Sequence, residues 1–381
     1  MGPLAGVRVL EFEAIGPGPF CGMLLADMGA DVLLVDRVSD PALGLTGERR
    51  HEVMLRGRRS VTLDLKSKLS VDAAVSLASR ADVVIEGFRP GVMERLGLGP
   101  DALLAANPKL VYGRMTGWGQ TGPLASRAGH DTDYIALAGV LNAIGHEGSR
   151  PVPPLNLVGD FGGGGMLLAF GIACALLETR TSGRGQVVDA AMIEGAGLLS
   201  TMLWGLHAAH RWSDARGVNV LDSGAPWYDT YATRDGKFFA IGAIEPKFYV
   251  ELLQRLGLAD EPSPAQHDRN GWPVLRERFA KAFAQKTRAE WERVFAEADA
   301  CAFPVLSFAE AAAHPHSVAR GAHVQLDGVL QPAPAPRFSR TPPEVRGCPP
   351  ERGAHGRAAL RDWGFDDDAI ARLRALGTGF D

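Results

Sequence analysis

The stretch RAGHDTDYIAL, residues 127–137, places a histidine next to two carboxylates. His130 follows Gly129 and precedes Asp131, with Asp133 three positions after it, where the spacing predicts the start of a helix. An imidazole exchanges its proton near neutral pH, and a neighbouring carboxylate can orient it. The residue types alone allow two interpretations of His130. It could transfer protons, or it could cap the helix or pack in the core with its hydrogen bonds satisfied. Without further information, the cap or the core histidine is favoured.

A second candidate acid is Asp160, in the stretch RPVPPLNLVGDFGGGG (150–165), which we expect to be a loop that leads into a buried helix. Burial among apolar residues would raise the pKa of this carboxyl into a range useful for proton transfer. An aspartate before a helix is also a common N-cap. The glycines over 162–165 fit a close approach of backbone to substrate and close helix packing equally well.

Basic residues gather between 49 and 68 and could hold a phosphate. They are Arg49, Arg50, Arg56, Arg58, Arg59, Lys66 and Lys68. Three further arginines follow predicted strands, namely Arg37, Arg89 and Arg95. Cations at the carboxyl edge of a parallel sheet can receive a polyphosphate. Composition alone nevertheless favours a solvated basic face.

The stretch GPGPFCG (16–22), with Asp36 ending the next strand, imitates a dinucleotide-binding fingerprint. The third glycine of G-x-G-x-x-G is replaced by Cys21, and Pro17 and Pro19 lack the N–H groups that a pyrophosphate needs. We therefore expect these residues to shape a turn, and nicotinamide binding is disfavoured.

Composition narrows the class of protein. The formal net charge of −4 over 381 residues argues against a nucleic-acid binder. The four cysteines are far apart, and no signal peptide is apparent, so we expect a cytoplasmic protein with reduced thiols. The longest apolar run, 165–177, is too short to span a membrane. His207 and His210 lack a nearby carboxylate or cysteine, so we expect no metal site there.

The elements that would position these residues alternate along the first part of the chain. Predicted strands cover 6–12, 30–37, 61–65, 81–88 and 110–119, with predicted helices over 20–29 and 68–80. Strands that alternate with helices indicate an α/β fold with a parallel sheet. A further helix is expected over 131–144, where apolar residues recur at helical spacing.

The character of the chain changes near residue 226. A hairpin is indicated by two short strands around the Asp235-Gly236 turn, and three helical segments follow it. We expect a large domain over 1–186 completed by the tail 321–381, linker helices over 187–225, and a smaller α+β domain over 226–320.

Motifs in chain order resemble the family III CoA-transferase superfamily. The N-terminal segments GVRVLE, GPGP and LADMGADVLLVDR resemble the opening of the family's sequences. Its alpha-methylacyl-CoA racemase branch resembles RMTGWGQTGP (114–123), AGHDTDY (128–134), PLNLVGDFGGGGM (154–166), GRGQVVDAAM (183–192), LDSGAP (221–226), GAIEPKFY (242–249) and APRFSRT (335–341). The matches run through nearly the whole chain, so they are more specific than any single motif.

The resemblance implies a Rossmann-like large domain and a smaller domain in an interlocked homodimer, with each active site between the large domain of one chain and the small domain of the other. It also implies a set of contacts to the acyl-CoA substrate. These residues are Arg37, Leu63, Asp64, Leu65, Lys66, Gly87, Phe88, Arg89, Arg95, Gly129 and Tyr134. A phosphate role is thereby favoured for Arg37 and Arg95, and less so for the arginines at 56, 58 and 59.

The implied reaction interconverts the epimers of 2-methylacyl-CoA thioesters by removal and return of the alpha proton. The resemblance assigns His130 and Asp160 as the two bases, Asp131 as support for His130, and Glu245 of the partner chain as the group that orients it. No cofactor is expected, because the thioester itself stabilises the enolate. The alternative is a CoA-transferase with Asp160 as nucleophile, and His130 disfavours it because acyl transfer needs no second base. A non-catalytic CoA-ester binding protein is disfavoured by the intact catalytic set.

Overall fold

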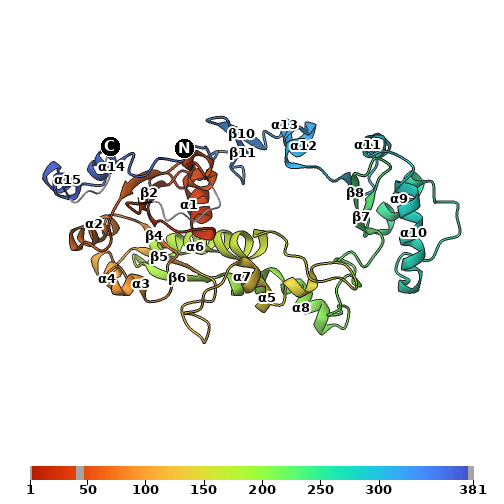
Figure 1. Ribbon diagram of the computed structural model, residues 1–381, viewed down its shortest axis with the longest axis horizontal. Helices are drawn as coiled ribbons and strands as arrows, with labels where there is room; N and C mark the ends of the chain where they lie inside the picture. The colour runs from red at the N-terminus through yellow and green to blue at the C-terminus, as the bar shows by residue number, and fades with distance from the viewer. Residues whose placement is uncertain (1, 40–46, 376–381) are drawn as a thin grey trace. The chain divides into compact units, whose positions relative to one another are not determined.

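The computed structural model describes residues 2–39 and 47–375 of the chain (Figure 1). Contacts divide the chain into two compact units. Unit 1 takes its described residues from Met1–Ala138, Leu155–Leu199 and His316–Asp381, and unit 2 consists of Gly139–Pro154 and Ser200–Pro315. The domain boundaries predicted at 186, 226 and 320 stay predictions.

Unit 1 is built on a six-stranded, all-parallel sheet in the order β3-β2-β1-β4-β5-β6. The strands are β1 (Arg8–Phe12), β2 (Asp31–Asp36), β3 (Arg59–Thr62), β4 (Val83–Glu86), β5 (Val111–Thr116) and β6 (Gln186–Ala191). The predicted α/β fold is therefore confirmed. The strand order reverses between β1 and β4, and ligands of such sheets bind at the carboxyl ends of the strands beside that reversal.

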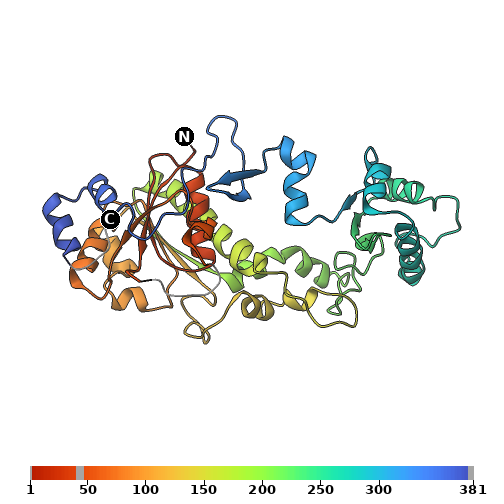
Figure 2. The ribbon, with the colours of Figure 1, turned by 45° about the horizontal axis from the view of Figure 1, so that its top comes forward.

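Helices cover both faces of the sheet (Figures 1 and 2). One apolar core joins the sheet to α2 (Lys68–Ala78), α4 (Pro100–Ala106), α14 (Gly356–Asp362) and α15 (Asp367–Arg374). The core on the opposite face joins it to α1 (Pro17–Asp27) and α6 (Leu167–Ser182). Successive strand residues alternate between the two cores, as Val9 and Leu10 do on β1, because side chains in a strand point to opposite faces.

The remaining elements of unit 1 are short. They are η1 (Arg49–His51), η2 (Val53–Leu55), α3 (Val92–Arg95), α5 (Asp131–Leu137), η4 (Leu157–Met166), α7 (Met192–Leu199), α13 (Pro315–Ala319), β10 (His323–Leu326) and β11 (Val329–Pro332). The predicted helix over 131–144 stops at Leu137. A glycine at 139 with φ of +82° follows, and such a left-handed residue ends a helix.

Three predictions about the middle of the chain are wrong. The linker predicted to be helical from 187 begins with β6, because Gln186–Ala191 pairs with β5 as an edge strand of the parallel sheet. The predicted loop over 150–165 is helical from Leu157, where η4 runs directly into α6. The helix over 165–177 was expected to be buried, but Phe170 and Leu177 are each 68% exposed, because α6 packs only one side on the sheet.

The combined helix Leu157–Ser182 is long and apolar enough to cross a bilayer. One such helix is weak evidence for a membrane span, because core helices have the same length and composition.

Unit 2 has a three-stranded antiparallel sheet in the order β7-β8-β9. Its elements are η3 (Leu141–Ala143), α8 (Thr201–Ala208), β7 (Tyr228–Ala232), β8 (Phe238–Gly242), α9 (Pro246–Leu256), η5 (Arg269–Gly271), α10 (Trp272–Phe283), α11 (Arg288–Phe295), β9 (Ala302–Pro304) and α12 (Phe308–Ala313). Buried aromatic side chains, including Trp227, Phe239, Phe283 and Trp291, form its core. The predicted hairpin and the α+β character of this region are confirmed.

Candidate active site

His130 stands at the N-terminus of α5 with an exposed side chain. Its backbone is extended, and its N–H donates to the carboxylate of Asp133 at 2.9 Å. The helix therefore needs the backbone of His130 for its cap. The ring is at the surface of unit 1, so a satisfied core histidine is excluded.

Asp160 lies inside the first turn of η4 and is partly buried. The expectation that Asp160 caps the helix is wrong, because the helix begins three residues earlier and Asn156 occupies the N-cap position. The Asn156 side-chain amide donates to Asp160 Oδ2 at 3.1 Å. Sequence reasoning missed Asn156, although its position four residues before an aspartate is the spacing at which side chains meet on a helix.

The protonation of Asp160 is controlled by its surroundings. Burial raises the pKa of this carboxyl above its ordinary value, the hydrogen bond from Asn156 opposes the rise, the charge of Asp131 adds to it, and His130 opposes it. Burial acts in this direction because it disfavours the charged form. The contribution of His130 means that the imidazole and the carboxyl of Asp160 lie within electrostatic reach of each other.

Asp131 connects the two candidate bases. Its carboxylate is buried, and its Oδ1 accepts a hydrogen bond from the backbone N–H of Asp160 at 2.7 Å. Its Oδ2 is buried and has no hydrogen-bond partner in the described part of the chain. Such oxygens are rare in folded proteins, so Oδ2 remains able to accept from a further donor.

Gly16, in the turn set aside above as an imitation fingerprint, belongs to this site. It is the N-cap of α1 and has φ of +64°, a conformation that favours glycine. A Cβ at this position would lie 3.1 Å from Asp160 Oδ2. The Gly-Pro-Gly-Pro sequence signalled only a turn, because nothing in it revealed that Asp160 packs against that turn.

Tyr134 lines the same region from α5. Its hydroxyl donates to the carbonyl of Gly129, and its ring meets Trp118 edge-on at 4.7 Å between centroids. Burial, together with the charges of Asp160 and Asp133, raises the pKa of Tyr134 to about 12, while Arg89 opposes the rise. Tyr134 therefore stays neutral at physiological pH, and Arg89 lies near enough to influence it.

The glycines after Asp160 are explained by close helix packing. A Cβ on Gly163 would lie 2.6 Å from the backbone nitrogen of Ala196, and one on Gly195 would lie 1.8 Å from the carbonyl oxygen of Gly163. The backbones of η4 and α7 are therefore in direct contact, which only glycine permits. Of the two explanations left open for these glycines, the contacts support packing.

A cavity of about 480 Å³ opens at the carboxyl ends of β1, β2 and β3, where an α/β sheet of this order binds ligands. It is lined by Phe12, Glu13, Val35, Asp36, Arg37, Val38, Ser39, Leu63, Asp64, Leu65, Lys66, Phe88 and Leu96. Arg37, the segment Leu63–Lys66 and Phe88 thus line one cavity, and their contact with an acyl-CoA stays a prediction. Gly87 and Arg89 follow β4, and Arg95 ends α3, directly before Leu96 of the lining.

Three arginines of the basic cluster form neither a solvated face nor a phosphate site. Arg56 pairs with Asp27 at 2.6 Å and Arg58 with Glu11 at 2.6 Å, and all four side chains are buried. The third, at position 49, pairs with the buried carboxylate at the end of β2. The acidic partners lie within β1, β2 and α1, far enough from the arginines in the sequence that local patterns could not predict the pairing.

Glu245 lies in unit 2, as the extended N-cap residue of α9 with an exposed side chain. His130 and Asp160 both lie in unit 1, and the role of Glu245 stays a prediction. Among residues 2–39 and 47–375, no three His, Cys, Asp or Glu side chains gather in a way that could hold a metal ion.

Comparison with known proteins agrees with the motifs. The model of CoA-transferase family III matches residues 4–356. The chain is 48% identical over 376 residues to "Alpha-methylacyl-CoA racemase" of Mus musculus and 44% identical over 377 residues to the protein of that name from Homo sapiens, in each case with 98% of this chain and 96% of the relative covered. It also resembles the crystal structure of a CAIB/BAIF family protein from Brucella suis, with a TM-score of 0.82 at 26% identity over 95% of this chain and 99% of that one.

Proposed function

Because this chain belongs to CoA-transferase family III, we propose that it is a racemase that interconverts the (2R) and (2S) epimers of 2-methylacyl-CoA thioesters. The observation that carries the proposal is the placement of His130 and Asp160 in one cluster, joined through Asp131. The relatives named racemases, at 48% and 44% identity, support it.

The reaction requires a base on each side of the alpha carbon. One base removes the alpha proton, the electron pair passes into an enolate, and the second group returns a proton to the opposite face. Asp160, whose pKa burial raises, suits an exchange between carboxylate and carboxylic acid. The exposed imidazole of His130 is accessible to a substrate as the opposing group.

The substrate is an acyl-CoA thioester, with its nucleotide portion in the cavity lined by Arg37, the segment Leu63–Lys66 and Phe88. No cofactor is needed, because the thioester carbonyl accepts the electrons of the enolate. We place the protein in the cytoplasm, as a homodimer in which Glu245 of a second chain orients His130. The orienting role is what the resemblance implies.

The proposal is tested by solvent exchange. The protein, with no added cofactor, is incubated in deuterium oxide with the CoA thioester of a single 2-methylacyl epimer. Incorporation of deuterium at the alpha carbon together with formation of the other epimer is the expected result. Transfer of CoA to a free acid without alpha exchange would instead assign the chain as a transferase in which Asp160 is the nucleophile.

Variants separate the two bases. His130→Ala should reduce proton exchange on one face of the alpha carbon more than on the other, because each base serves one face. Asp160→Ala should show the opposite asymmetry. Exchange at the wild-type rate in His130→Ala would remove the histidine from the mechanism.

A further inference from the structure

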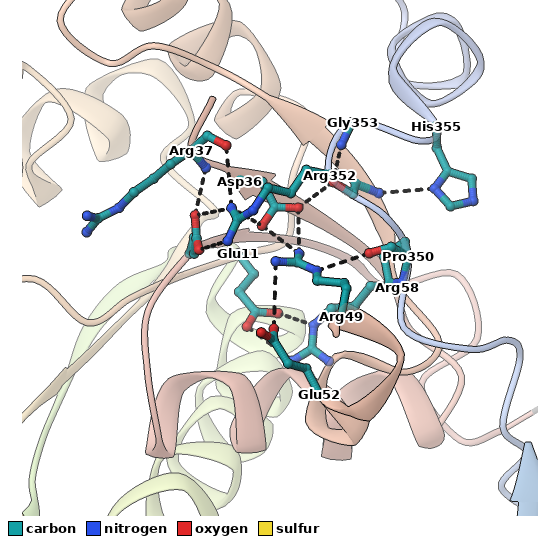
Figure 3. Close-up of polar contacts among 12 residues, drawn as sticks. Glu11, Asp36, Arg37, Arg49, Glu52, Arg58, Pro350, Arg352, Gly353 and His355 are labelled. Carbon is teal, nitrogen blue, oxygen red and sulfur yellow. Dashed lines mark hydrogen bonds and ion pairs between the residues drawn. The ribbon is translucent and has the colours of Figure 1, made fainter. Parts of the chain in front are cut away.

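A polar cluster connects the C-terminal arm, residues 333–355 between β11 and α14, to the cavity at the ends of β1 and β2 (Figure 3). At its centre, Arg352 binds Glu13 through two hydrogen bonds of 2.7 and 2.8 Å, one to each carboxylate oxygen. The side chains of this Glu13–Arg352 pair are only 13% and 19% exposed. Such a two-point contact fixes both the orientation of the guanidinium and its distance from the carboxylate, so this part of the arm is held in one position relative to β1.

The Glu13–Arg352 pair also holds both backbone polar groups of Arg37. The N–H of Arg37 donates to Glu13 Oε2 at 2.7 Å, and its carbonyl accepts from Arg352 Nη1 at 3.4 Å. The side chain of Arg37 points away from the cluster in Figure 3, and the residue lines the cavity. The backbone of Arg37 is thus fixed while its guanidinium stays available to a ligand.

The same cluster neutralises a carboxylate that would otherwise repel an anion. Asp36, at the end of β2, accepts from Arg49 at 2.7 Å on each oxygen, from the hydroxyl of Ser60, and from Arg352 at 3.3 Å. In dinucleotide-binding folds, an acid at this position binds a ribose hydroxyl. Here Asp36 is fully buried and occupied by its own chain, so a ligand meets Arg37 next to it.

The arm that carries Arg352 is anchored independently of the ligand. Ser60 on β3 accepts from Gly353 N–H at 2.8 Å through its hydroxyl and from His355 N–H at 3.1 Å through its carbonyl. Arg49 donates to the carbonyl of Pro350 at 3.1 Å. Arg352 therefore reaches Arg37 from a segment that is more than 300 residues away in the sequence but docked along the edge of the sheet.

We propose that Arg352 and Glu13 are positioning residues for coenzyme A, which hold Arg37 so that its guanidinium meets a phosphate of the CoA nucleotide. The inference rests on the proposed function, since it takes an acyl-CoA as the ligand. It adds a role for the C-terminal arm in ligand affinity, through a residue that touches no substrate atom itself.

The test measures the affinity of free coenzyme A by calorimetry, together with KM and kcat for the acyl-CoA. Arg352→Gln should raise the Kd for coenzyme A about tenfold, the size expected when one charge-assisted contact is loosened. KM should rise more than kcat falls. Arg352→Lys keeps the positive charge but cannot bind both carboxylate oxygens of Glu13 as a planar guanidinium does. Its Kd for coenzyme A should lie between those of the wild type and the Gln variant.

Glu13→Ala separates positioning from charge. Removal of an anion beside the cavity would tighten coenzyme A binding if only the local field mattered. If the pair positions Arg37, the same variant should bind coenzyme A more weakly. In an Arg37→Gln background, Arg352→Gln should add little further loss, because the two changes act through one contact.

The matched control is Arg59→Gln. Arg59 also joins a C-terminal element to the sheet, because it pairs with Asp362 of α14 at 2.7 Å and with Asp31 of β2 at 2.8 Å. Within the described residues, no hydrogen bond or ion pair joins Arg59 to Glu13, Arg37 or Arg352. It should leave the Kd unchanged. Wild-type protein that fails to bind coenzyme A would overturn the proposed function and this inference together. Wild-type affinity in Arg352→Gln, or tighter binding in Glu13→Ala, would overturn the inference alone.

Discussion

Asp131 Oδ1 accepts a hydrogen bond of 2.7 Å from the backbone N–H of Asp160, so α5 and η4 are tied together beside the two candidate bases. The residue that follows His130 in the sequence thereby sets the position of Asp160. One carboxylate thus couples two segments that lie about thirty residues apart, which would keep the bases in register through the reaction.

Asp131→Ala removes this coupling. We expect about a hundredfold loss of kcat/KM, the size that a displacement of a catalytic group on the order of 1 Å produces. Asp131→Asn keeps an oxygen that can accept from the Asp160 N–H and should lose only about tenfold, as for other supporting residues. Steady-state racemisation kinetics would test whether the Ala variant loses more kcat/KM than the Asn variant. Equal activities in the two variants would show that the charge, not the hydrogen bond, matters.

Gly16→Ala should damage the site without contact with the substrate. The new Cβ would stand 3.1 Å from Asp160 Oδ2, at a φ of +64° that alanine tolerates poorly. We expect at least about a tenfold loss of activity from the displaced carboxyl and a loss of about 1 kcal/mol in the free energy of unfolding.

The control for this variant is Gly6→Ala. Gly6 has φ of +87°, but a Cβ there meets nothing within 4 Å. It should lose similar stability in urea unfolding and retain full activity. Equal losses of activity in both variants would attribute the effect of Gly16→Ala to backbone strain alone.

Asn156→Ala should move the pH dependence of racemisation. The Asn156 amide stabilises the charged form of Asp160, so its removal raises the pKa of that carboxyl further. In the proposed reaction Asp160 must be a carboxylate when it removes the alpha proton, so the acidic limb of kcat/KM reports its protonation. That limb should shift to higher pH, equally for both epimers because the equilibrium constant does not change. If the acidic limb does not move, the protonation of Asp160 is not what it reports.

Arg58→Met should destabilise the fold strongly. Arg58 and Glu11 form an ion pair with side-chain exposures of 0% and 1%, and removal of one partner from such a pair costs about 3–5 kcal/mol. Burial already raises the pKa of Glu11 and Arg58 opposes the rise, so the variant should raise it further. A group whose pKa is raised in the folded state makes the protein less stable as the pH increases. The loss in the free energy of unfolding caused by Arg58→Met, measured with urea, should therefore be smaller at low pH than at neutral pH.

Lys68→Met is the matched control. The ion pair of Lys68 with Asp72 is exposed on α2, with side-chain exposures of 86% and 56%. Exposed pairs contribute little, so we expect less than about 1 kcal/mol of change. A comparable loss in both variants would contradict the importance of burial.

These ion pairs also mark the limit of what the sequence could predict. The alternation of strands and helices predicted the parallel sheet because its periodicity is local. The arginines at 56 and 58 looked like a surface cluster because their acidic partners, Asp27 and Glu11, lie in other elements. Only the folded chain brings them together.

The candidate site divides in the same way. His130 and Asp160 were recognised by residue type and by motifs that resemble a family. Gly16 and Arg352 were not, since a turn glycine and an arginine in a proline-rich arm carry no local sign of the carboxylates they meet. Long-range packing, which periodicity does not encode, places both.

The position of Glu245 in unit 2 makes a dimeric active site testable. His130→Ala and Glu245→Ala chains, each of which we expect to lose racemisation as a homodimer, are co-expressed with different tags and purified as a heterodimer. If Glu245 acts on His130 of the other chain, one of the two sites regains both residues, and activity should return to about half of wild type. The control pairs a wild-type chain with a His130→Ala/Glu245→Ala chain. Each site of this control dimer lacks one of the two residues, so the control should stay inactive. If instead each site took both residues from one chain, the control would be active and the first heterodimer inactive.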